Sequence, residues 1–135
     1  MAETVLMSFK RASLKDAVGL DLTTASKLKV VLVTSSHSFN TDNDEFVDDI
    51  SGANVVMTSD AFTGVVAATG ANLDATDGVS ITDPDNGRTS SQGFLYYDTG
   101  TPGTSRLLMH DDALVHASDA ADDTLNFNAS GIFDL

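Results

Sequence analysis

The chain has 135 residues, of which 41% are apolar, and it contains no cysteine. This length and composition fit one globular domain with a modest core, and they exclude a fold held by disulfides or a metal site built on thiolates. The formal net charge is −13: residues 1–29 carry five basic and three acidic side chains, whereas the remainder carries two basic and 17 acidic ones. Such an acidic body would repel nucleic acid, and no apolar run approaches the roughly 18 residues that a membrane span needs.

Residues 1–26 are predicted to form an N-terminal arm that packs on or extends from the domain, which covers residues 27–135. Residues 3–26 are ambiguous: residues 3–10 alternate loosely and suit an edge strand, while residues 13–22 could form one or two helical turns, with Ser13 as N-cap and Gly19 near the end. Basic residues follow the apolar ones here, which is the reverse of a secretory signal. We therefore expect an unprocessed, soluble protein that is made in the cytoplasm.

The clearest strand lies at residues 27–36, where valine and leucine dominate and lysines mark the solvated side of its first residues. A short amphipathic α-helix is predicted around residues 42–50. Asp42 can cap that helix, with Glu45 three residues later completing a capping-box pattern, and apolar residues follow at helical spacing.

From residue 53 onward, the sequence divides into strand-length pieces that are separated by turn residues. The predicted strands are residues 54–59, 64–69, 78–82, 93–98, 105–110, 113–118, 124–129 and 131–135. Many short strands at roughly ten-residue spacing favour an all-β fold. We therefore predict a mainly-β, single-domain antiparallel β-sandwich or barrel, in which the one short helix closes an end.

Residues 99–103, Thr-Gly-Thr-Pro-Gly, read as the tip of a hairpin with a fixed shape. Pro102 restricts φ, while the flanking glycines permit positive φ. Tyr96 and Tyr97 precede this tip, and because neighbours in a strand point to opposite faces, one of them is expected to be exposed. Tyrosine is favoured at protein interfaces, which makes the pair candidate contact residues.

Two acidic stretches, residues 42–49 and 83–88, have carboxylates at the close spacing that suggests calcium. Neither satisfies the EF-hand pattern, because Phe46 and Gly87 fall at position five of the loop, where that pattern requires Asp or Asn. A capped helix and an Asn-Gly turn explain both stretches.

The chain also offers little for catalysis. Its histidines, His37, His110 and His116, have no spacing typical of a zinc site, which needs three or four ligands. The sequence has no Gly-x-Ser-x-Gly elbow, no Gly-rich phosphate loop and no base placed beside a nucleophile. We therefore predict no catalytic residue, no cofactor and no metal ligand, and a protein that is not an enzyme.

Three stretches resemble a family of small structural proteins that are encoded beside the major capsid gene of tailed bacteriophages. They are LKVVLVTSSHSFNTDNDEFVDDIS (28–51), GFLYYDTGTPGTSRLL (93–108) and LNFNASGIFDL (125–135), in matching order and spacing. The first two are fairly specific and the third is weak alone. Between residues 53 and 92 this chain is more acidic than such proteins often are.

The resemblance implies a capsid decoration, or cement, protein on the outer surface of the virion head. Its partners would be the major capsid protein and further copies of itself, as a homotrimer, and not nucleic acid or a membrane. The family has no defined catalytic residues to carry over. Together with the basic arm and the shaped tip, the resemblance selects these candidate contact residues: Lys10, Arg11, Lys15, Tyr96, Tyr97, Thr99, Pro102 and Arg106.

Other functions remain open at this point. The protein could belong to the tail or to the head–tail junction of the virion, or it could be a β-sandwich that binds glycans or calcium at the virion surface. A small hydrolase is a further alternative, for which the sequence supplies no positioned nucleophile.

Overall fold

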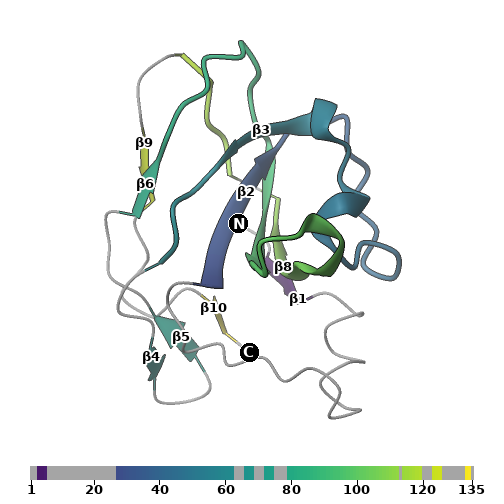
Figure 1. The fold of residues 1–135 in the computed structure, drawn as a ribbon, viewed down its shortest axis with the longest axis vertical. Helices are drawn as coiled ribbons and strands as arrows, with labels where there is room; N and C mark the ends of the chain where they lie inside the picture. Colours follow the sequence, from purple (N-terminus) through teal and green to yellow (C-terminus); the bar gives the residue numbers. More distant parts are fainter. Residues whose placement is uncertain are drawn as a thin grey trace.

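The computed structural model describes residues 3–5, 27–62, 66–68, 72–74, 79–112, 114–119, 123–125 and 133–134. These residues form a mainly-β structure whose helices are all single 3-10 turns, which confirms the predicted fold class (Figure 1). The strands are β1 (Glu3–Val5), β2 (Leu28–Val33), β3 (Val55–Thr58), β4 (Val66–Ala68), β5 (Asn72–Asp74), β6 (Val79–Ile81), β7 (Gln92–Tyr97), β8 (Arg106–Asp111), β9 (Asp123–Leu125) and β10 (Phe133–Asp134). The 3-10 helices are η2 (Val47–Asp49), η3 (Gly52–Asn54) and η4 (Pro102–Thr104).

The largest sheet has five antiparallel strands in the order β1-β8-β7-β2-β3. In the part of the chain that the structure describes, this sheet is open, with β1 and β3 at its edges. Two smaller sheets accompany it, β6-β9 and β10-β5-β4, the latter in the lower part of Figure 1. The edge strand predicted near the N-terminus is therefore present at β1, while the alternative helical turns of residues 13–22 lie outside the described residues.

Two β-bulges adapt the five-stranded sheet to its core. The register shifts between Leu32 and Val33 opposite β3, and again between Leu95 and Tyr96 opposite β8. Each bulge inserts one extra residue into the partner strand, so that consecutive side chains reach the same side of the sheet. This is why Leu108 and Met109, although adjacent in sequence, join the same hydrophobic cluster.

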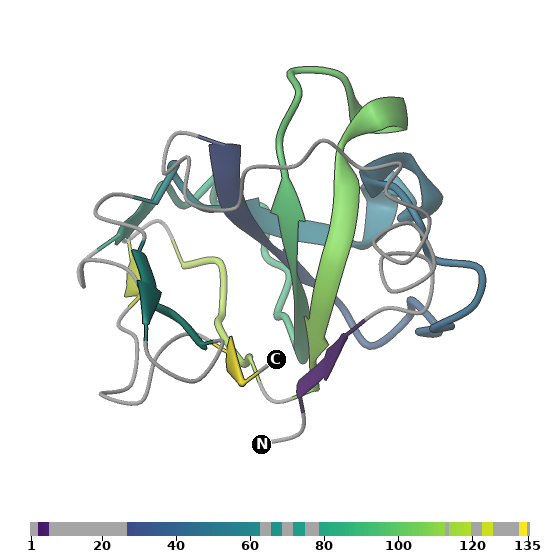
Figure 2. The same cartoon turned by 90° about the horizontal axis from the view of Figure 1, so that it is seen from below.

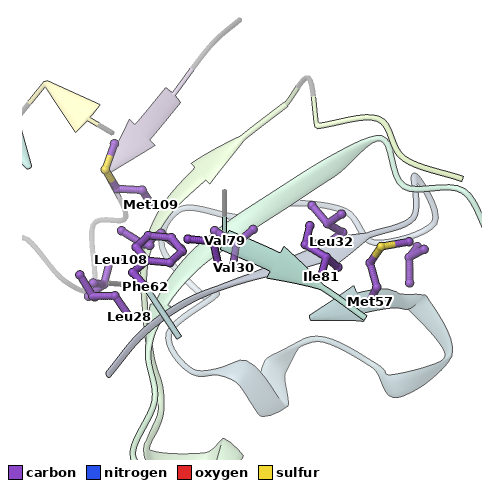
Figure 3. Close-up of a cluster of buried hydrophobic side chains, with 11 residues drawn as sticks. Leu28, Val30, Leu32, Met57, Phe62, Val79, Ile81, Leu108 and Met109 are labelled. Carbon is purple, nitrogen blue, oxygen red and sulfur yellow. The ribbon is translucent and has the colours of Figure 1, made fainter. Parts of the chain in front are cut away.

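That cluster, the β6-side cluster, fills the space between the sheet and β6 (Figure 3). Its buried members are Leu28, Val30, Leu32, Val56, Met57, Phe62, Val79, Ile81, Leu95, Leu108 and Met109. Burying one such side chain contributes about 1.5–3 kcal/mol. The alternating residues of β2 explain the geometry, because Leu28, Val30 and Leu32 share one face of the strand.

The opposite face of the sheet is also covered, by the chain between β2 and β3. The loop-side cluster consists of Val31, Val33, Ile50, Phe94, Tyr96 and Leu107. Phe39 and Val47 of that connection and Val55 of β3 pack against it. A sheet with both faces covered explains why β2 becomes apolar on both sides after its first residues.

The α-helix predicted around residues 42–50 is wrong. Asn40, not Asp42, organises this segment, since its side-chain oxygen accepts the N–H groups of Asp42 and Asn43 at 2.9 and 3.2 Å. The chain then extends at Phe46, whose φ of −126° and ψ of 164° end any helical path. The only helical turn in this segment is η2, where the Asp49 carboxylate accepts the N–H groups before the turn.

The other strand predictions fare better. The structure has strands at residues 28–33 and within 54–59, 64–69, 78–82 and 131–135, and a hairpin at 92–111. β9 overlaps only the start of the predicted 124–129, and β5 was not predicted. The predicted strand at 113–118 is wrong in the residues described there, because Ala117 makes only a single bridge, to Thr89.

Within the described ranges, no helix has the length and apolar character that a membrane crossing needs.

Candidate functional site

The hairpin tip between β7 and β8 is organised by Asp98. Its carboxylate accepts the Gly100 N–H at 2.8 Å and lies 2.7 Å from the Lys29 Nζ of β2. The Ser105 Oγ also lies 3.4 Å from the Asp98 carboxylate. The hydrogen bond from Lys29 is the main reason that the pKa of Asp98 lies below its ordinary value. The base of the tip is therefore fixed by an ionised carboxylate.

Hydrogen bonds among Thr and Ser residues then set the shape of the tip itself. The Ser105 hydroxyl donates to the Thr101 carbonyl at 2.9 Å and accepts the Thr99 N–H at 3.1 Å. The hydroxyls of Thr99 and Thr104 lie 2.5 Å apart. Two backbone N–H groups, those of Thr104 and Ser105, also reach the Thr101 carbonyl and close the η4 turn that Pro102 begins. These hydrogen bonds hold the tip in one conformation without a hydrophobic core.

The two glycines of the tip serve different purposes. Gly100 adopts φ +85°, a conformation that other residues rarely adopt, as the sequence predicted. Gly103 has no positive φ, but a Cβ atom there would lie 3.0 Å from the Asp48 carboxylate oxygen. A side chain at Gly103 would therefore require the exposed Asp48 carboxylate to shift slightly where η4 contacts η2 (Figure 2, where the green tip lies beside the blue segment).

The segment before η2 runs alongside the start of β8 and supports the tip from that side. The Val47 N–H donates to the Ser105 carbonyl at 2.9 Å. Arg106 pairs with Glu45, Nη1 to Oε1 at 3.1 Å, and its guanidinium lies 4.8 Å from the centre of the Phe46 ring. Because β1 pairs with the far end of β8, this segment and β1 share one edge of that strand.

We define the tip face as Thr99–Thr104 together with Asp48 and Asp49. All of these residues are exposed, and hydrogen bonds of Asp98, Thr99, Thr101, Ser105 and Asp49 hold the backbone of the tip and of the chain before η2. Two basic side chains at the base of the tip, Lys29 and Arg106, are paired with Asp98 and Glu45. The tip face is therefore a shaped, polar, mildly acidic surface, and the chemistry that it can perform is binding.

Apart from the two tyrosines, the predicted contact residues fall into three groups. Thr99 and Pro102 are exposed on the tip face. Lys10, Arg11 and Lys15 lie outside the described residues, so their contacts stay a prediction. Arg106 is partly buried and its guanidinium is held by Glu45 and Phe46, so it supports the tip face from behind.

The two tyrosines point to opposite faces, as predicted, but neither is fully exposed. Tyr96 belongs to the loop-side cluster and is 7% exposed, and Tyr97 packs against the β6-side cluster. Burial, and secondarily the charge of Asp98, raise the pKa of Tyr96 to about 12. The prediction of Tyr96 as a contact residue is therefore wrong, because both faces of this sheet are covered.

Sequence reasoning missed the residues that hold the tip from a distance. Lys29 lies 69 residues before Asp98 in the chain, and Glu45 lies 61 residues before Arg106. The Asp-Thr-Gly sequence at 98–100 was a usable signal, since aspartate before such a pair commonly accepts the N–H two residues on. Nothing in the sequence near Lys29 or Glu45 indicates that these residues pair with Asp98 and Arg106.

In the acidic turn at residues 83–88, the Asp83 carboxylate holds the backbone in place. Asp83 accepts the N–H groups of Asp85 and Asp119, both at 2.7 Å, and the Ser118 hydroxyl. Asn86 donates to the Val56 carbonyl of edge strand β3. In the described part of the chain, no group of three or more acidic or histidine side chains is arranged to hold a metal ion.

Comparison of the chain with protein-family models, with curated proteins and with solved structures finds no match.

Replacing Asp98 by asparagine is expected to lower the free energy of unfolding by about 1 kcal/mol at neutral pH, because the charged hydrogen bonds of the tip base are lost. The folded pKa of Asp98 is depressed below 3.8, so its contribution is complete above that pH and is lost as the pH falls through the folded pKa. Urea unfolding at pH 7 and pH 3 should therefore show a difference between wild type and Asp98→Asn that shrinks in acid. Asp60→Asn, at an exposed aspartate, is the matched control and should change stability by less than about 0.5 kcal/mol. An equal loss in both variants would contradict the organising role of Asp98.

Proposed function

We propose that this chain is a capsid decoration protein, a virion structural protein that binds the outer surface of a tailed-bacteriophage head. It bridges neighbouring capsomers of the major capsid protein and stabilises their contacts by adhesion, without catalysing a reaction. Many copies, as homotrimers, share the shell, so that modest contacts add up to firm attachment. The single observation that carries this proposal is the tip face, an exposed surface that is held in one shape.

A fixed exposed loop needs an explanation, because ordering each backbone residue costs about 1–2 kcal/mol. Residues 99–104 cover no core, since all six are exposed. Their order instead depends on the hydrogen bonds of Asp98 and Ser105. A surface that is ordered before it binds loses less entropy on association. That benefit is the simplest physical reason for this arrangement.

The resemblance to decoration proteins supports the same reading. Its two more specific stretches, residues 28–51 and 93–108, form β2 with its covering connection and the β7–tip–β8 hairpin. They therefore supply every residue that builds the tip face and the pairs that brace it. This resemblance therefore falls on the part of the fold that we propose for binding.

A charge placed on the tip tests the proposal. Thr101→Glu is expected to weaken binding to undecorated heads by about tenfold or more, equivalent to about 1.4 kcal/mol. The Thr101 side chain is exposed, and only its backbone atoms hold the tip together. Binding is measured by co-sedimentation with heads assembled from the major capsid protein of the same genome.

Thr82→Glu is the matched control, because Thr82 is equally exposed and follows β6, away from the tip in sequence. It adds the same charge and should bind as the wild type does. Equal binding by Thr101→Glu and the wild type would remove the tip face from the proposal. Binding to tails, with bare heads left unoccupied, would favour the tail or head–tail alternative.

A further inference from the structure

Two histidines lie within one polar cluster beneath the loop at residues 34–46, which covers the loop-side face of the sheet. His37 Nε2 lies 3.0 Å from Asp44 Oδ2, and His110 Nε2 lies 2.8 Å from Gln92 Oε1. Asp44, Gln92 and His110 are all buried, and His37 is nearly so. The tip-face proposal makes no use of this cluster.

Gln92 fixes the proton position on His110. Its amide nitrogen donates to the carbonyls of Thr34 and His37, both at 2.8 Å, so its oxygen must face His110 as an acceptor. His110 therefore carries a proton on Nε2 in its neutral form, and Nδ1 is the atom that gains the next proton. One hydrogen-bonded chain thus links β8, β7 and the loop.

Aromatic rings enclose the same histidine. Phe39 of the loop stacks on His110 with ring centres 3.8 Å apart and planes 4° apart, and Phe94 contacts it at 4.9 Å. His37 meets the Phe94 ring at 5.7 Å. A proton added to His110, which is only 6% exposed, would therefore place a charge beside apolar rings and largely out of water.

The charged groups near His110 come from several elements. Asp111 and Asp112 follow it, and Asp44 and His37 belong to the loop, while β1 places Thr4 in register with His110. Burial outweighs the three aspartates, so the pKa of His110 lies below its usual value, and the charge of His37 acts in the same direction. The closed loop is therefore more stable when the His110 imidazole is neutral.

We propose that the loop at residues 34–46 is a proton-sensitive latch: when His110 gains a proton, the loop leaves the sheet. The loop ends at Glu45 and Phe46, which hold Arg106 beside the tip face. Opening the latch therefore loosens the support of that face. The consequence for capsid binding rests on the function proposed above, whereas the opening itself does not.

The direction of the pH dependence follows from linkage. In the open loop His110 is hydrated and has an ordinary pKa of about 6.5, whereas in the closed loop its pKa is lower. The open form therefore binds more protons below pH 6.5. The closed form is fully favoured above that pH and loses its advantage as the pH falls through the closed-loop value.

Hydrogen exchange of the free protein, read by NMR at pH 7.5 and 5.5, tests the latch. After correction for intrinsic rates, protection of the loop amides should fall by up to about tenfold per pH unit below 6.5, while amides of β2 and β7 stay protected. His110→Gln keeps a side-chain donor for Gln92 but does not titrate, so its loop protection should not change with pH. His116→Gln, which removes a histidine outside the cluster, should respond as the wild type does.

Two outcomes would overturn the latch: loop protection that is equal at both pH values in the wild type, or a pH response that persists in His110→Gln. If that variant does not fold, the wild-type NMR titration decides, since the His110 ring signal must titrate together with loop exchange. No capsid is present in these measurements, so their outcome is independent of whether the protein decorates heads.

Discussion

Replacing Phe94 by alanine is expected to lower the free energy of unfolding by about 3–5 kcal/mol. Phe94 is completely buried at the centre of the five-stranded sheet, and its ring contacts those of His37, Phe39 and His110. Alanine would leave a cavity between the sheet and the loop at residues 34–46. Because the loop is held by this ring and by the polar cluster beside it, the change should also expose the loop to exchange.

Urea unfolding followed by circular dichroism measures the loss. The control is Val115→Ala, which also removes apolar atoms, but from a side chain that is 65% exposed. That control should change stability by less than about 0.5 kcal/mol. A loss below about 1 kcal/mol for Phe94→Ala would show that this ring does not join the loop to the sheet.

The second large effect is expected at Gly93, where alanine should cost about 1–3 kcal/mol through overpacking. A Cβ atom at this position would lie 2.6 Å from Leu114 Cδ1 and 3.2 Å from the Val31 carbonyl oxygen. The Leu114 side chain can move, but the Val31 carbonyl belongs to the neighbouring strand β2, which cannot withdraw without disturbing the register. Leu114 would also give up its packing against the β6-side cluster.

Gly52→Ala is the matched control for this substitution. A Cβ at Gly52 would meet no atom within 4 Å among the described residues, and its backbone has no positive φ. The same chemical change should therefore be nearly neutral there. Thermal unfolding of the two variants compares them directly, and equal midpoints would contradict the tight packing of β7 on β2.

The β7–tip–β8 hairpin could be predicted from the sequence because its signals are local. Two apolar runs flank a Pro- and Gly-containing connection, and the Asp98 that organises it lies at the end of the first run. The strand at residues 28–33 could be predicted equally well, since its valine- and leucine-rich composition is typical of a buried strand. In these elements, local preference and tertiary structure agree.

The segment at residues 42–50 could not be predicted in the same way. Its acids and apolar residues fit a capped helix, but tertiary contacts use them differently. Asp44 pairs with His37, and Phe46 lies under the guanidinium of Arg106. These contacts require an extended chain at Phe46, and their gain exceeds the small helix preference of so short a segment. A pattern read from neighbours in sequence has no access to such partners.

The prediction that one of the two tyrosines is exposed was wrong for a related reason. Alternation correctly placed Tyr96 and Tyr97 on opposite faces, but it cannot say whether a face is solvated. The covering chain comes from the connection between β2 and β3, which buries Tyr96. Because both faces of this sheet are covered, strand residues were poor candidates for exposure, whereas residues 99–104 of the tip are all exposed.

The central claim, adhesion to a virion head, is tested most directly by one binding measurement. Purified wild-type protein is titrated onto tailless heads that lack it, and the bound fraction is measured after sedimentation. The account predicts saturable binding at a fixed number of copies per capsid subunit, together with a higher melting temperature of the occupied heads. Protein that remains in the supernatant at every concentration, with heads that melt unchanged, would contradict it.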